Sequence, residues 1–155
     1  LLNKYFKSMI DVVFKYNGTL DKIVGDELMV LYGVPLKTKD DTNNAVLTAV
    51  KMFDALDKFN KNIVKEGYKP FKIGIGINKG KAVSGNIGSE QQMNYTVIGD
   101  TINLGARLCS HAKSGEILIS SSVKDVIGDN YNFKKIPAIE VKGKANPIDV
   151  WLYKH

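Results

Sequence analysis

The stretch YTVIGDTINLGARL, from Tyr95 to Leu108, decides the fold of this 155-residue sequence. Its first residues, 95–98, are aromatic or β-branched and predict a short strand. Asp100 then stands where a helix cap is expected, and we assign it no chemistry. The helix is predicted to reach about residue 112 and to be largely buried, because five of its positions are apolar or cysteine. These positions are Ile102, Leu104, Ala106, Leu108 and Cys109.

Upstream, the first quarter of the chain predicts a helix followed by a hairpin. Apolar side chains recur at helical spacing from Leu2 to Phe14, so the chain is expected to begin inside a helix that Asn17-Gly18 ends. Residues 19–24 and 27–32 are rich in β-branched and large apolar side chains. They predict two strands joined by a tight Gly25-Asp26 turn.

The middle of the chain predicts a second helix and a second hairpin. Asp40-Asp41 are the expected N-caps of a long amphipathic helix that ends at Gly67. Residues 71–77 alternate apolar with small or polar side chains, and after a turn at 78–80 the chain is expected to return through residues 82–87. This pattern predicts a hairpin made of these two segments.

The C-terminal part completes an α+β sandwich. Residues 116–119 predict a strand, residues 120–122 cap a short helix, and two or three strands follow, with Trp151 near the end. The order indicates a ferredoxin-like fold in which helices pack on a mostly antiparallel sheet. Such a fold normally starts with a strand before its first helix, so we expect the first strand to be absent from this chain. We expect one domain, residues 1–155.

Composition narrows the possible partners and cellular settings. Apolar residues make up 44% and charged residues 25% of the sequence, as in ordinary globular domains. No apolar run approaches the roughly 18 residues of a membrane span, and we expect no direct membrane contact. Cys109 is the only cysteine, so no intrachain disulfide can form and a cytoplasmic setting is expected, alone or within a larger membrane or sensor protein.

The net charge of +6 indicates anionic partners. Three classes of partner carry the required negative charge: nucleic acid, a membrane surface and phosphorylated small molecules. The lysines are scattered, however, without a basic helix or an aromatic base-stacking motif, so we do not expect nucleic-acid binding.

Four polar side chains stand out as candidates for chemistry, each with an ordinary structural alternative. Asp26 in the first hairpin turn can hold Mg²⁺ or simply form the turn. Asn103 and Arg107 lie four residues apart on one helix face, and Arg107 is the only arginine. Their pair can bind a sugar oxygen and a phosphate, or make hydrogen bonds within the fold. Lys142 lies between two C-terminal strands, and either it or the nearby Lys144 can reach a phosphate or remain a surface lysine.

Taken together, these segments resemble the class III adenylyl/guanylyl cyclase family, and the resemblance runs from Leu1 to Tyr153. Residues 18–26 (GTLDKIVGD) resemble the hairpin that carries the family's second metal aspartate. Residues 80–89 resemble its Gly-Asn-Ile-Gly-Ser hairpin, and residues 95–108 its catalytic helix.

The resemblance implies a role for each of six side chains. It makes Asp26 a ligand of two Mg²⁺ or Mn²⁺ ions, Lys22 and Thr96 the readers of the purine, Asn103 the group that orients the ribose, Arg107 the stabiliser of the α-phosphate, and Lys142 a contact for the terminal phosphates. Adenine-specific members have lysine and threonine at the base-reading positions, whereas guanylyl cyclases have glutamate and cysteine. A lysine donates to the adenine ring nitrogen and a threonine hydroxyl accepts from its amino group, while guanine presents the reverse pattern.

The resemblance also implies a reaction and an assembly. The ribose 3′ oxygen of ATP attacks the α-phosphorus with the help of two metal ions, giving cyclic AMP and pyrophosphate. The site is expected at the interface of a head-to-tail homodimer, where Lys22 and Asp26 of one chain serve different sites. The family's first metal aspartate lies on the strand that this sequence lacks, so we expect this stretch alone to be inactive. A non-catalytic cyclase-like module that binds nucleotide or a partner is the alternative.

Overall fold

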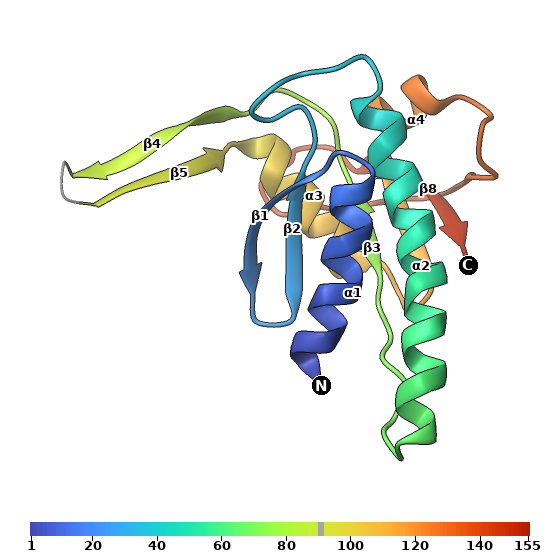
Figure 1. Ribbon diagram of the computed structural model, residues 1–155. Helices are drawn as coiled ribbons and strands as arrows, with labels where there is room; N and C mark the ends of the chain where they lie inside the picture. The colour runs from blue at the N-terminus through green and yellow to red at the C-terminus, as the bar shows by residue number, and fades with distance from the viewer. Residues whose placement is uncertain (90–91) are drawn as a thin grey trace. The chain divides into compact units, whose positions relative to one another are not determined.

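The computed structural model describes residues 1–89 and 92–155. For residues 86–89 and 92–96 it describes the backbone but not the side chains. Its elements, in chain order, are α1 (Leu2–Lys15), β1 (Thr19–Val24), β2 (Glu27–Leu31), α2 (Asp41–Lys65), β3 (Ile75–Ile77), β4 (Val83–Ser89), β5 (Gln92–Ile98), α3 (Asp100–His111), β6 (Glu116–Ser120), α4 (Ser121–Ile127), β7 (Lys134–Ile139) and β8 (Ile148–Lys154) (Figure 1). Antiparallel pairs predominate, as the predicted α+β class requires. No helix in the described ranges is long and apolar enough to cross a membrane.

The chain divides into two compact units. The first unit consists of Leu1–Gly74, Lys113–Glu116 and Lys154–His155, and the second of Ile75–Ala112 and Ile117–Tyr153. The first unit therefore contains the α1 and α2 helices and the first hairpin, and the second contains nearly all of the remaining strands.

In the first unit, α1 and α2 pack through apolar side chains at helical spacing. The buried positions of α1 are Tyr5, Phe6, Met9 and Val13, and α2 buries a longer series from Val46 to Ile63. Aromatic rings contribute to this core: the centre of the Phe71 ring lies 5.1 Å from that of Tyr5 and 5.3 Å from that of Phe59. Such tilted and edge-on ring pairs add to the stabilisation from burial alone.

The N-cap of α2 lies at a predicted position, but the expected capping bond from its side chain is not formed. Asp40 occupies the N-cap position, yet its side chain makes no capping hydrogen bond. The carboxylate of Asp41 turns back instead and accepts hydrogen bonds from the amide and hydroxyl of Thr38, at 2.7 and 2.9 Å. These bonds fix the loop that leads into the helix.

The first hairpin has the predicted strands and turn. β1 pairs antiparallel with β2 from Thr19 opposite Leu31 to Val24 opposite Glu27, with one irregularity between Leu20 and Lys22. Gly25 has φ +62°, a conformation that favours glycine, and Asp26 completes the turn.

In the second unit, the strand order of the main sheet is β3-β6-β8-β7. β3 is parallel to β6, and β7 is antiparallel to β8. The centre of the core is formed by Leu108 of α3 with Leu118 and Val150 of the sheet, all at most 2% exposed. α3 is thus held on the sheet by apolar contact along one side.

The predicted second hairpin is wrong. Residues 75–77 pair with β6, while β4 pairs with β5 in an antiparallel ribbon from Val83 opposite Ile98 to Ser89 opposite Gln92 (Figure 1). The alternating pattern identified strands but not their partners, which tertiary packing selects. The expected turn at 78–80 instead carries the chain from one sheet to the other.

The prediction that α3 is largely buried is also wrong. Within this helix only Leu108 is fully buried, and the side of the helix that carries Asn103 and Arg107 is exposed. The apolar positions from Ile102 to Leu108 are two residues apart, and that spacing spreads them around a helix rather than along one face.

Replacing Gly76 by alanine is expected to destabilise the second unit. A Cβ atom at residue 76 would lie 2.2 Å from the amide nitrogen of Cys109 and 2.8 Å from the carbonyl oxygen of Gly105, both backbone atoms of α3. Relieving that overlap moves the helix, so we expect Gly76→Ala to lower the free energy of unfolding by about 2 kcal/mol or more in chemical denaturation. Gly85→Ala is the matched control, because nothing lies within 4 Å of its Cβ position. Equal stability of the two variants would contradict this close packing.

Candidate functional site

The site is built on the first turn of α3, where β5 passes directly into the helix. Gly99 has φ +141° at the N-cap, a backbone conformation that strongly favours glycine. Its carbonyl oxygen accepts hydrogen bonds at 3.2 Å from the amides of Ile102 and Asn103. This tight start leaves Asn103 and Arg107, one helical turn apart, on the exposed side of α3.

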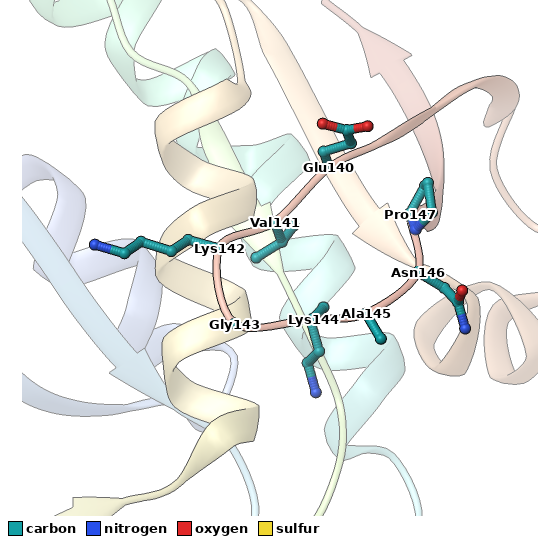
Figure 2. A pocket seen from close by; sticks show the side chains of 8 residues that line it. All are labelled: Glu140, Val141, Lys142, Gly143, Lys144, Ala145, Asn146 and Pro147. Carbon is teal, nitrogen blue, oxygen red and sulfur yellow. The ribbon is translucent and has the colours of Figure 1, made fainter.

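A loop between β7 and β8, residues 140–147, lies beside α3. Val141 anchors the loop with 9% exposure, and Gly143 reverses the chain with φ +90°. Lys142 and Lys144 leave the loop in different directions (Figure 2). The loop therefore offers two lysines that serve different neighbours.

Asn103, Arg107 and Lys142 line one open pocket of about 460 Å³. The pocket also has Asp100 and Lys144 at its wall. The pair that the sequence singled out on a helix and the lysine that it singled out between two C-terminal strands are thus brought together, in a volume within the range of small-molecule sites. The cationic groups of Arg107 and Lys142, together with the amide of Asn103, are suited to a ligand that combines phosphate with a sugar.

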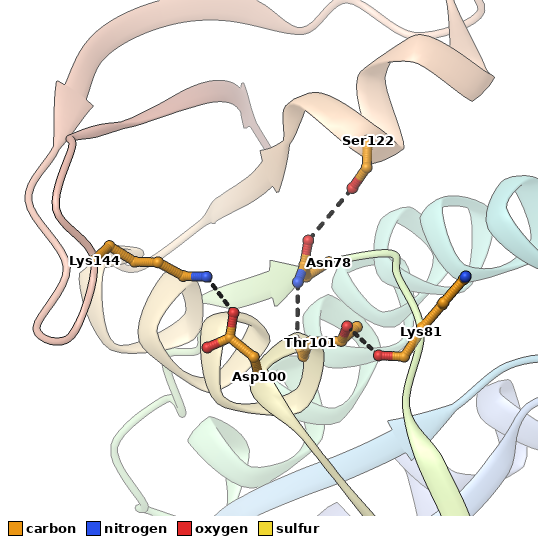
Figure 3. Close-up of polar contacts among 6 residues, drawn as sticks. All are labelled: Asn78, Lys81, Asp100, Thr101, Ser122 and Lys144. Carbon is orange, nitrogen blue, oxygen red and sulfur yellow. Dashed lines mark hydrogen bonds and ion pairs between the residues drawn. The ribbon is translucent and has the colours of Figure 1, made fainter.

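The predicted role of Asp100 as a helix cap is wrong. Gly99 is the N-cap, and the carboxylate of Asp100 forms an ion pair with the ammonium of Lys144 across the pocket wall (Figure 3). Both side chains are partly exposed, at 71% and 36%, so this pair adds little stability. It does occupy Lys144, whereas Lys142 makes no ion pair with any residue in the described part of the chain.

Asn78, which the sequence placed in a hairpin turn, connects three segments around the start of α3 (Figure 3). Its amide nitrogen donates to the Thr101 carbonyl at 3.0 Å, and its amide oxygen accepts from the Ser120 hydroxyl at 2.7 Å. The hydroxyl of Ser122 donates to the Lys79 carbonyl at 2.8 Å. The only signal in the sequence was a polar amide directly after an apolar strand.

The remaining predicted site residues lie on β1, its turn and β5. Asp26 is exposed at the hairpin turn, and its carboxylate makes no hydrogen bond or ion pair with the residues that the structure describes. Lys22 is half exposed on β1 of the same hairpin. Thr96 lies on β5, but its side chain is outside the described part of the structure.

The donor atoms around Asp26 decide whether it can hold a metal ion. Across residues 1–89 and 92–155, no three histidine, cysteine or acidic side chains gather into a metal cluster. A single free carboxylate nevertheless fits Mg²⁺, which proteins often hold through one or two carboxylates together with phosphate oxygens of the substrate.

Replacing Asn78 by alanine is expected to loosen the start of α3. The change removes two hydrogen bonds, one to the Thr101 carbonyl and one from the Ser120 hydroxyl, and at about 0.5–1.5 kcal/mol for each bond the two together contribute about 1–3 kcal/mol. We expect thermal unfolding of Asn78→Ala to show a loss of that size. Asn62→Ala, on an exposed position of α2, is the control and should change stability by less than about 0.5 kcal/mol. Similar melting of both variants would exclude a structural role for Asn78.

Comparison with known proteins gives a consistent picture. The family model described as "Adenylate and Guanylate cyclase catalytic domain" matches residues 1–154. Among curated relatives, adenylate cyclase 1 of Rhizobium meliloti (strain 1021) is 27% identical over 97% of this chain. An adenylate cyclase of Anabaena cylindrica is 32% identical over 99% of it. The chain spans only 23% and 31% of the lengths of these two relatives.

Solved structures agree with the fold. The chain is similar to the guanylyl cyclase Cya2, with a TM-score of 0.92 and 39% identity over 97% of this chain and 76% of that one. It is similar to the adenylyl cyclase CyaB from P. aeruginosa, with a TM-score of 0.93 and 36% identity over 97% of this chain and 79% of that one. The backbone of this chain is thus about equally similar to a structure named as a guanylyl cyclase and to one named as an adenylyl cyclase.

Proposed function

We propose that this chain, which belongs to the adenylate and guanylate cyclase catalytic domain family, is the catalytic domain of a protein that converts ATP to cyclic AMP and pyrophosphate. The observation that carries the proposal is the pocket in which Asn103, Arg107 and Lys142 meet. These are three of the positions to which the resemblance gives contacts with the substrate. Residues 1–155 would act as one catalytic domain.

Within this proposal, the side chains of α3 act on the reacting end of the nucleotide. Arg107 is expected to bind the α-phosphate through its planar fork, where negative charge grows as the ribose 3′ oxygen attacks. Asn103, one turn earlier on the same exposed side, is positioned to hold the ribose so that its 3′ oxygen is in line. Lys142 would neutralise the terminal phosphates, which leave as pyrophosphate.

Asp26 is the residue of this chain expected to hold Mg²⁺ or Mn²⁺. When bound, two such ions would reduce the repulsion among the phosphates and assist both the nucleophile and the leaving group. The exposed carboxylate at the hairpin turn is accessible for that role. We expect a head-to-tail homodimer in a cytoplasmic setting, in which Asp26 of one chain completes the pocket of its partner.

The choice of ATP over GTP rests on the side chains at two positions. Overall similarity does not separate the two substrates, because the matched adenylyl and guanylyl cyclase structures have almost equal TM-scores. Lys22 and Thr96 are the residues that the resemblance places at the purine, and both fit the donor and acceptor pattern of adenine. This pair is the reason for proposing cyclic AMP as the product.

The first test is a direct assay with site variants. We expect the full-length gene product, incubated with ATP and Mn²⁺, to form cyclic AMP measurable by chromatography. Arg107→Ala and Asn103→Ala should each reduce kcat by about 100-fold or more, as is typical when a group that stabilises the transition state is removed. Both side chains are exposed, so the melting temperatures of the two variant proteins should stay close to that of the unchanged protein.

Ser110→Ala, at an exposed position of the same helix, is the matched control for this test and should retain activity. Near-normal turnover in either site variant would remove the proposed mechanism. Retained ATP binding without any cyclic AMP from the unchanged protein would point to a non-catalytic nucleotide-binding module instead.

The two loop lysines provide a second test. Lys142→Ala should raise the KM for ATP by about 10-fold, because a charge-assisted contact with phosphate contributes roughly 1.5–3 kcal/mol. Lys144→Ala should raise the KM by less than about 3-fold, since Lys144 is paired with Asp100 and an exposed ion pair contributes little. Steady-state kinetics on both variants measure the difference. The reverse order of effects would assign the phosphate contact to Lys144.

A further inference from the structure

Asp21 on β1 has a buried carboxylate, one oxygen of which lacks a hydrogen-bond partner among the described residues. Its side chain is only 8% exposed. One oxygen, Oδ2, is buried and has no hydrogen-bond partner in the described part of the chain. Buried carboxylate oxygens are normally paired, because an unpaired one loses its interaction with water without replacement. A hydrogen-bond donor or a positive charge nearby would compensate for that loss.

The compensating charge is the ammonium of the adjacent residue. The Nζ atom of Lys22 lies 3.8 Å from the Oδ2 atom of Asp21. This distance is too long for a hydrogen bond but within the range of an ion pair. Lys22 keeps 48% of its side chain exposed, so part of its ammonium remains available to a ligand.

An irregularity in the hairpin makes this contact between neighbours possible. In a regular strand, consecutive side chains point to opposite faces of the sheet. Here Leu20 pairs with Val30 and Lys22 with Met29, two adjacent residues of β2, so Asp21 is an extra residue without a partner. Such a bulge changes the direction of a side chain, and bulges are frequent next to active sites.

We propose that Asp21 is a positioning residue that holds the ammonium of Lys22 in place for the purine ring and thereby raises the preference for adenine over guanine nucleotides. The inference rests on the proposed function, because it requires Lys22 to contact the base. A lysine has a long flexible side chain with three equivalent donors, so its selectivity depends on an anchor. Asp21 supplies that anchor from the buried side and leaves other N–H groups of Lys22 free.

The experiment measures binding of ATP and of GTP, each with Mn²⁺, to the full-length gene product by isothermal titration calorimetry. Asp21→Asn removes the charge and nearly keeps the shape. We expect its affinity for ATP to fall about two- to five-fold, the effect typical of a partly exposed ion pair, with a smaller change for GTP. Asp11→Asn is the matched control, because Asp11 forms an exposed ion pair with Lys7 at 2.9 Å on α1. Its ratio of ATP to GTP affinity should stay unchanged.

A double-mutant cycle identifies the residue through which Asp21 acts. In a Lys22→Ala background, Asp21→Asn should change the ratio of ATP to GTP affinity no further, since the two residues work as one unit. If Asp21→Asn lowers the ratio of ATP to GTP affinity in that background as much as it does alone, the inference is overturned and Asp21 has a role in the fold only. An unchanged ratio in Asp21→Asn, with a reduced ratio in Lys22→Ala, would overturn the inference but keep the proposed function.

Two outcomes concern the proposed function and the fold. An unchanged ratio in Lys22→Ala would remove the base-reading assignment, and this inference with it. If Asp21→Asn does not fold, Asp21→Glu provides the test, because it keeps the charge and moves the carboxylate by one methylene group. We expect Asp21→Glu also to lower the ratio of affinities, and an unchanged ratio would overturn the inference.

Discussion

The close contact between β3 and the backbone of α3 is the constraint on which the candidate pocket depends. At Gly76 the strand comes so near to the helix that a Cβ atom would overlap the amide nitrogen of Cys109. Leu108 then packs on Leu118 and Val150 of the same sheet. With that side of α3 fixed, Asn103 and Arg107 are left on the exposed side, where a ligand can reach them.

The loop after β7 completes the pocket. A comparison of two free-energy contributions indicates which contact holds this loop in place. Burying a valine side chain contributes about 1.5–3 kcal/mol, and Val141 is 9% exposed. The exposed ion pair between Asp100 and Lys144 contributes at most about 1 kcal/mol. Val141 therefore anchors the loop, while the ion pair selects which lysine remains free. Among the residues that the structure describes, that lysine is Lys142, in the same pocket as Arg107.

Features that depend on neighbours in the sequence could be predicted. The first hairpin follows from β-branched strands around Gly25, and the pairing of Asn103 with Arg107 from their spacing on a helix. The partner of β3 could not be predicted, because strand pairing is chosen by contacts distant in sequence. The ion pair of Asp100 with Lys144 and the bonds of Asn78 to Thr101 and Ser120 are distant in the same way. No local pattern encodes them.

Preference for one purine has to come from a few side chains rather than from the backbone. The chain matches a guanylyl and an adenylyl cyclase structure with TM-scores of 0.92 and 0.93, so the same backbone serves both named activities. A site built for one hydrogen-bond pattern rejects the other strongly, because the wrong base leaves polar groups unpaired. That rejection requires donors held in fixed directions, and a free lysine side chain rotates easily. A buried carboxylate next to Lys22, supplied by one extra residue in β1, restricts that rotation without blocking access of the base to the ammonium.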